Sequence, residues 1–156
     1  MKKVLLLVLP LLLVGCSKDK LTLEKDEYLV FKEELLEKNN FTNEEDINFD
    51  LTISVDRVNE EEISYRAIID NPKENMHNIK AILVHDYLTD EVFPSLGIFD
   101  DTIDLIIDDE NIKGINLVGY IKTTKEIKEI DLNIKVYVEY TDDNNKVKKV
   151  YYNSTK

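Results

Sequence analysis

Few residues of this chain have side chains suited to nucleophilic or acid–base catalysis. The two histidines are His77 and His85, and Asp86 follows His85 directly. Neighbouring residues of a β-strand point to opposite faces of the sheet, so His85 and Asp86 form a poor orienting pair. Ser95 lies in the sequence Phe-Pro-Ser-Leu-Gly, which lacks the first glycine of a nucleophile elbow. We therefore predict no catalytic residues and no cofactor, with a small hydrolase as the least favoured alternative.

Metal binding is the second chemistry to consider, because carboxylates are numerous. Zinc prefers Cys and His ligands, and the chain has one cysteine and two separated histidines. Calcium prefers oxygen ligands, and acidic residues are dense in one stretch: Asp100, Asp101, Asp104, Asp108, Asp109 and Glu110. An EF-hand loop beginning at Asp109 has suitable residues at its third and sixth positions, Asn111 and Gly114. Its fifth and twelfth positions are Lys113 and Tyr120, where calcium ligands are required. We expect a solvated acidic rim and assign no metal site, with calcium binding as the open alternative.

Tyrosine is the remaining residue type with a functional interpretation. If the last two strands form a hairpin, four tyrosines lie on it: Tyr137, Tyr140, Tyr151 and Tyr152. Tyrosine is common in binding surfaces because it buries a large area at low entropy cost. Aromatic pairs also stabilise a sheet when they lie opposite each other on neighbouring strands. We favour the structural interpretation.

The amino-terminal residues have the order expected of a secretory signal. Two lysines at positions 2 and 3 precede an apolar run of 11 residues, 4–14. A membrane-spanning helix needs about 20 apolar residues, roughly twice this length. The run has the length of the hydrophobic region of a signal peptide.

The apolar run ends in the motif Leu13-Val14-Gly15-Cys16, which contains the only cysteine of the chain. This motif resembles the lipobox of bacterial lipoproteins. The resemblance implies a diacylglyceryl group on the Cys16 sulfur, cleavage before Cys16, and acylation of the new amino terminus by a fatty acid such as palmitate. Residues 1–15 would be a lipoprotein signal peptide, and residues 16–20 the lipidated Cys16 and a short linker. We thus expect a lipid anchor on the extracytoplasmic face of the cell membrane, the alternative being an ordinary signal peptide with a chance cysteine.

The charge balance excludes one class of partner. The chain has 32 acidic and 20 basic residues, and a formal net charge of −12. Loss of the signal peptide would leave 32 acidic against 18 basic residues, a formal charge of −14. Such a chain is not expected to bind nucleic acid. Anionic lipid would also repel it over a Debye length of about 8 Å, so the lipid anchor rather than the charge must attach it to a membrane.

Residues 21–40 are predicted to form one amphipathic helix. Tyr28, Phe31 and Leu35 recur at the spacing of one helix face, and Thr22 is a plausible N-cap. We favour a helix that packs across one end or face of the domain. A stalk or partner-binding helix next to the anchor is the alternative.

From residue 41 onward, apolar residues recur at every second position, as in a β-strand, rather than at the spacing of a helix face. Alternating or apolar segments typical of strands occur at 49–55, 63–69, 79–84, 103–107, 115–121, 132–140 and 147–152, with a short candidate at 91–93. The more apolar segment 79–84 is predicted to be a central strand, and 142–145 a hairpin loop.

A helix followed by strands, without βα alternation, argues against a parallel sheet. We predict that residues 41–156 form an antiparallel, immunoglobulin-like β-sandwich of about seven strands. This pattern resembles many small extracytoplasmic lipoprotein domains, and an α+β domain or small barrel is the alternative.

These observations predict a lipid-anchored extracytoplasmic protein that is a non-enzymatic binding or accessory module of the cell envelope. Its expected partners are the membrane, through Cys16, and another envelope protein. A small ligand- or ion-binding carrier domain is the alternative function.

Overall fold

The computed structural model describes residues 19–88 and 91–155 of the chain. The predicted signal peptide and Cys16 lie outside the described residues. Helix α1 is Lys20–Glu37 and eight strands follow: β1 (Asp50–Asn59), β2 (Glu62–Asp70), β3 (Met76–His85), β4 (Ser95–Leu96), β5 (Ile103–Leu105), β6 (Gly114–Lys122), β7 (Asn133–Thr141) and β8 (Val147–Thr155). Short 3₁₀ turns lie at Glu44–Asp46 and Ile127–Glu129.

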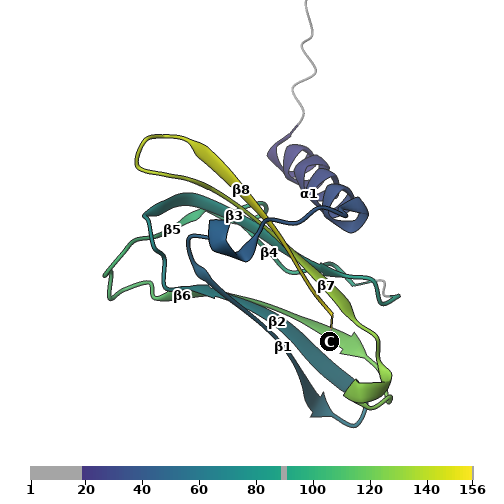
Figure 1. Ribbon diagram of the computed structural model, residues 1–156. Helices are drawn as coiled ribbons and strands as arrows, with labels where there is room; N and C mark the ends of the chain where they lie inside the picture. The colour runs from purple at the N-terminus through teal and green to yellow at the C-terminus, as the bar shows by residue number, and fades with distance from the viewer. Residues whose placement is uncertain (1–18, 89–90, 156) are drawn as a thin grey trace, which may run out of the picture.

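The strands form two antiparallel sheets (Figure 1). One sheet has the order β1-β2-β6, and the other has the order β4-β3-β7-β8 with β5 also paired to β3. All six strand pairings are antiparallel. The prediction of a mainly β, antiparallel domain behind one amino-terminal helix is confirmed. Within the described residues the sheets stay separate and do not close into the barrel considered as an alternative.

The main core lies between the two sheets. Alternate residues of β2, such as Ile63 and Ala67, face alternate residues of β7, such as Val136 and Val138. Strand β3 is apolar on both sides, since Leu83 enters this core whereas its neighbours face the opposite way. Burial on both faces explains why this segment reads as a continuous apolar run rather than an alternation. The central position predicted for it is confirmed by the strand order.

Helix α1 covers the outer face of the β3–β7–β8 sheet (Figure 1). Tyr28 and Leu35 are buried there, and Phe31 packs beside them. The Tyr28 hydroxyl accepts a hydrogen bond of 2.9 Å from the Phe93 amide, and Phe31 lies 4.9 Å from Tyr137 between ring centroids. The helix thus packs on a face of the domain, as the favoured prediction stated.

The ends of α1 differ in part from the prediction. Asp19, not Thr22, is the N-cap, because its Oδ1 accepts a hydrogen bond of 2.7 Å from the Thr22 amide. Interactions with the side chain of Thr22 and with its amide lower the pKa of Asp19. A carboxylate at this position also faces the positive end of the helix dipole. At the other end, the Lys135 ammonium donates to the carbonyls of Leu36 and Lys38, at 2.6 and 2.9 Å.

The hairpin loop between β7 and β8 is held by hydrogen bonds to an aspartate side chain. Residues 142–145 connect β7 to β8 as predicted, and Asp142 Oδ1 accepts hydrogen bonds from the amides of Asn144 and Lys146.

The candidate strand at 91–93 is wrong, because strand pairing in this region begins at Ser95. Gly97, just after β4, has φ of +72°, and a Cβ atom there would lie 2.5 Å from the Ile79 carbonyl oxygen.

Candidate functional site

His85 is buried at the carboxyl end of β3, with 2% of its surface exposed. Its ring meets the rings of Tyr65 and Phe93 edge to face, at centroid distances of 4.6 and 5.0 Å. Within the described residues, neither ring nitrogen makes a hydrogen bond of good geometry, although the Tyr87 backbone interacts with the ring. Burial lowers the pKa of His85, and the Tyr87 backbone opposes this shift to a smaller extent. Burial therefore favours the neutral form of the imidazole.

The structure does not assemble Ser95, His85 and Asp86 into a triad. Ser95 pairs with Ile82 in the sheet, three residues before His85. The Asp86 carboxylate accepts a hydrogen bond of 3.0 Å from the Asn133 amide. With no bond from His85 to either residue, the described chain holds no activated serine at this position.

A small pocket lies where the end of α1 meets β3 and β7. It has a volume of about 190 Å³ and is lined by Leu36, Val84, His85, Asp86, Asn133 and Lys135. Asn133 Oδ1 is buried, with no hydrogen-bond partner among the described residues. A polar cavity of this size has room for several water molecules or one small polar molecule. Sequence reasoning missed Asn133 and Lys135, because polar residues of a strand ordinarily indicate only a solvent face.

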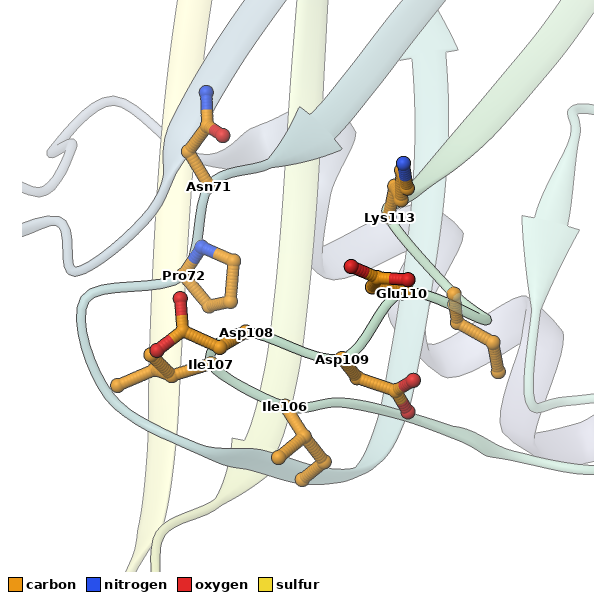
Figure 2. Close-up of a pocket in the computed structure, with 9 residues that line it drawn as sticks. Asn71, Pro72, Ile106, Ile107, Asp108, Asp109, Glu110 and Lys113 are labelled. Atoms are coloured by element: carbon orange, nitrogen blue, oxygen red, sulfur yellow. The ribbon is translucent and has the colours of Figure 1, made fainter.

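The acidic residues of the stretch 100–110 have different surroundings: Asp100 accepts a hydrogen bond from the Gly97 amide, whereas Asp108, Asp109 and Glu110 line one hollow. The hollow lined by Asp108, Asp109 and Glu110 has a volume of about 480 Å³ and lies beside the loop between β5 and β6 (Figure 2). The carboxylates of Asp108 and Asp109 point away from each other in this view. Asp109 Oδ1 accepts hydrogen bonds of 2.8 Å from the Asn111 amide and side chain. Across residues 19–88 and 91–155, no three acidic, His or Cys side chains gather closely enough to hold a metal ion.

His77 is the centre of a polar cluster that the sequence analysis did not foresee. Its Nδ1 lies 3.0 Å from Asp104 Oδ2, and its Nε2 lies 2.9 Å from Asp143 Oδ1. The hydrogen bonds to Asp104 and Asp143 raise the pKa of His77. The bonds from His77 and the Asn78 amide lower the pKa of Asp104. The imidazole of His77 thus joins β3, β5 and the β7–β8 hairpin, and its two carboxylate partners favour its protonated form.

This cluster predicts a pH-dependent contribution to stability. Because the pKa of His77 is raised in the folded state, its contribution is fully present below the ordinary value of about 6.5 and is lost as the pH rises through the folded value. Both ion pairs are partly exposed, so we expect the effect to stay below about 1 kcal/mol. Urea unfolding of wild type and His77→Gln from about pH 5.5 to 9 measures it.

The variant isolates His77 because any contribution of His85 is common to both proteins and cancels in the difference. We expect the stability difference to be largest in acid and to shrink above about pH 6.5. A difference that grows as the pH rises would contradict this assignment.

Three of the four tyrosines of the last hairpin, Tyr137, Tyr140 and Tyr151, donate hydrogen bonds from their hydroxyls to carboxylates of the same chain. Tyr137 and Tyr151 lie opposite each other on β7 and β8, with ring centroids 5.0 Å apart. Their hydroxyls donate to Glu139 and Glu34, at 2.7 and 2.6 Å. Tyr140 faces the main core instead, and its hydroxyl donates to Glu74, as do Asn48 and Lys148. These contacts support the structural interpretation of the tyrosines.

Comparisons with known proteins identify no relative. No protein-family model matches the sequence, and no curated protein is significantly similar to it. In the part of the chain that the structure describes, no helix has the length and hydropathy needed to cross a bilayer. The function is therefore inferred from the residues and geometry of this chain.

Proposed function

We propose that this chain is a lipid-anchored extracytoplasmic protein whose β domain is a non-enzymatic binding or accessory module of the cell envelope. The motif Leu13-Val14-Gly15-Cys16, behind a basic start and a short apolar run, carries this proposal. Two acyl chains on one residue hold a protein firmly on a bilayer, whereas one chain gives marginal binding. The short stretch from Cys16 to the N-cap Asp19 would keep the domain close to its anchor.

The strand order supports an immunoglobulin-like sandwich in the broad sense. The sheet β1-β2-β6 has the order of strands A, B and E of that fold, and β3-β7-β8 has the order of strands C, F and G. The short strand β4, beside β3, takes the place of strand C′. One departure is β5, which pairs with β3 rather than with β6. The cysteine pair and tryptophan of antibody domains are absent from the sequence.

Two features of the described residues support a binding or accessory role over catalysis. The imidazole of His85 is buried against the rings of Tyr65 and Phe93, and the hydroxyls of Tyr137, Tyr140 and Tyr151 are bonded to carboxylates of the same chain. The pocket lined by Asn133 and Lys135 is the feature that a small ligand would use.

Replacing Cys16 by serine should abolish the attachment of lipid to residue 16. We expect the wild-type chain to float with membranes, to incorporate labelled palmitate, and to begin at an acylated Cys16 by mass spectrometry. The Cys16→Ser variant should lose the label and the cleavage before residue 16, because no thiol remains to accept the lipid. Ser17→Ala is the matched control and should behave as wild type. A wild-type chain with an intact leader or a free thiol would contradict the proposal.

The accessory role has its own measurement. Affinity purification of the full, lipidated chain from detergent-solubilised membranes should recover the same envelope protein in repeated preparations. A chain that is recovered each time as a monomer without a reproducible partner would count against that role while leaving the anchor intact.

A further inference from the structure

We infer that the first turn of α1, around Leu21 and Leu23, is a membrane-contact surface that seats the domain against an anionic lipid bilayer. The inference rests on the lipid anchor at Cys16 proposed above. It concerns how the folded body meets the membrane, which the anchor alone does not decide. Three independent features support it: the length of the tether, the apolar side chains at the helix start, and the distribution of charge.

The tether between the anchor and the fold is very short. Three residue steps separate Cys16 from Asp19, the N-cap of α1. A fully extended chain spans at most about 3.6 Å per residue, so the Cα atom of Asp19 lies within about 11 Å of that of Cys16. The headgroup layer on each side of a bilayer is itself about 5–8 Å thick. An acylated Cys16 therefore holds the start of α1 at or just above the lipid headgroups.

The helix start carries two leucines that the fold does not bury. Leu21 and Leu23 are each 54% exposed, although they begin a helix whose later turns pack on a sheet. Contacts of α1 with that sheet include the ion pair between Glu27 and Lys80 and, next along the chain, the buried Tyr28. In Figure 1 the purple first turn lies at the end of the view opposite the turn between β1 and β2. The first turn thus presents two exposed leucines at the end of the molecule that the tether brings to the membrane.

Charge distinguishes this end from the rest of the chain. Residues 18–25 have three basic and two acidic side chains, whereas residues 26–156 have 15 basic and 30 acidic ones. Lys20 is almost fully exposed, and its ammonium lies 3.4 Å from Glu24. An anionic bilayer repels the strongly acidic body within a Debye length of about 8 Å, but it tolerates this nearly balanced end. Electrostatics and apolar burial therefore favour the same orientation, in which the first turn of α1 contacts the bilayer and the acidic body points away from it.

A single-thiol labelling experiment tests the inference in the full, lipidated chain. Acylation occupies the only natural cysteine, so an introduced cysteine is the one free thiol. An environment-sensitive fluorophore is attached in the variants Leu21→Cys and Leu23→Cys. The purified lipoprotein is placed in vesicles of phosphatidylcholine and phosphatidylglycerol, some of which contain a spin-labelled quencher lipid.

Two exposed positions serve as matched controls. Val30 is 60% exposed and lies seven residues after Leu23, on the same helix face but two turns farther from the anchor. Val58 is 49% exposed and lies in β1, near its turn to β2. We expect the quencher lipid to reduce emission from positions 21 and 23 at least about twofold more than from position 58, because only a probe at the headgroup level contacts lipid. Quenching of a probe at position 30 should be weaker than at positions 21 and 23 and stronger than at position 58.

The outcomes distinguish failure of the membrane-contact surface from failure of the lipid anchor at Cys16. If the protein floats with the vesicles but positions 21 and 23 are open to aqueous iodide as fully as position 58, the membrane-contact surface is wrong and the anchor stands. If these positions are shielded from both iodide and quencher lipid, a protein covers them and the inference again fails. If mass spectrometry shows an unacylated Cys16 and the protein does not float, both ideas fail together.

Discussion

Replacing Leu35 with alanine should lower the free energy of unfolding by about 2–5 kcal/mol. Leu35 is fully buried between α1 and the outer face of the β3–β7–β8 sheet, in a cluster with Val84 and Tyr137. Truncation removes apolar contacts and leaves a cavity that packed neighbours fill only in part. Urea unfolding, followed by circular dichroism at a wavelength sensitive to the helix, measures the loss.

The adjacent residue is a matched control for this prediction. Leu36 has the same side chain, one position further along α1, and is 38% exposed. Leu36→Ala should cost less than about 1 kcal/mol, because most surface substitutions have small effects. Equal effects of the two substitutions would contradict a docked helix and would favour the stalk or partner-binding alternative.

Replacing Gly119 with alanine should destabilise the protein by about 1–3 kcal/mol. Gly119 lies opposite Tyr65 in the pairing of β2 with β6. A Cβ atom at this position would lie 2.2 Å from Cζ and from the hydroxyl oxygen of Tyr65. Tyr65 is buried and packs its ring against His85, so it must shift to relieve the overlap. The chain therefore needs glycine here for space rather than for an unusual backbone angle.

A second substitution tests whether the contact with Tyr65 causes the destabilisation by Gly119→Ala. In a Tyr65→Val background the overlap is absent, and Gly119→Ala should then be nearly neutral, which gives a coupling energy of about 1–3 kcal/mol in a double-mutant cycle. Gly114→Ala, at the start of the same strand β6, is the comparison: its Cβ would lie 3.0 Å from the Ile69 carbonyl oxygen and does not meet Tyr65, so the Tyr65→Val background should leave its effect unchanged. Additive effects of the Tyr65 and Gly119 substitutions would rule out the overlap as the mechanism.

Strands with a strong local pattern could be predicted from the sequence. Residues 132–140 alternate because Ile134, Val136 and Val138 face the core between the sheets while their neighbours do not. Segment 79–84 was predicted to be central because a strand buried on both faces is apolar throughout. The candidate strand at 91–93 failed because Phe93 anchors the loop to α1, where its amide donates to the Tyr28 hydroxyl. A contact between residues 65 positions apart leaves no trace in the local pattern.

The start of helix α1 is a second feature that the local sequence does not decide. Thr22 and Asp19 are both good N-cap residues, and the choice depends on which backbone first leaves the helical conformation. Asp19 has extended backbone angles, so its carboxylate accepts the Thr22 amide and Thr22 becomes part of the first turn.

The sequence by itself determined the alternation of the strands, the amino-terminal helix, the acidic charge and the motif at Cys16 that predicts an anchor. These are properties of neighbouring residues, and the backbone periods of helix and strand make them readable. Only the tertiary structure decided that His77 lies between Asp104 and Asp143, that His85 is buried against Tyr65, and that Asn133 lines a pocket beside α1. Strand order and register bring such residues together, and both arise from many weak contacts summed over the whole core, which no local pattern records.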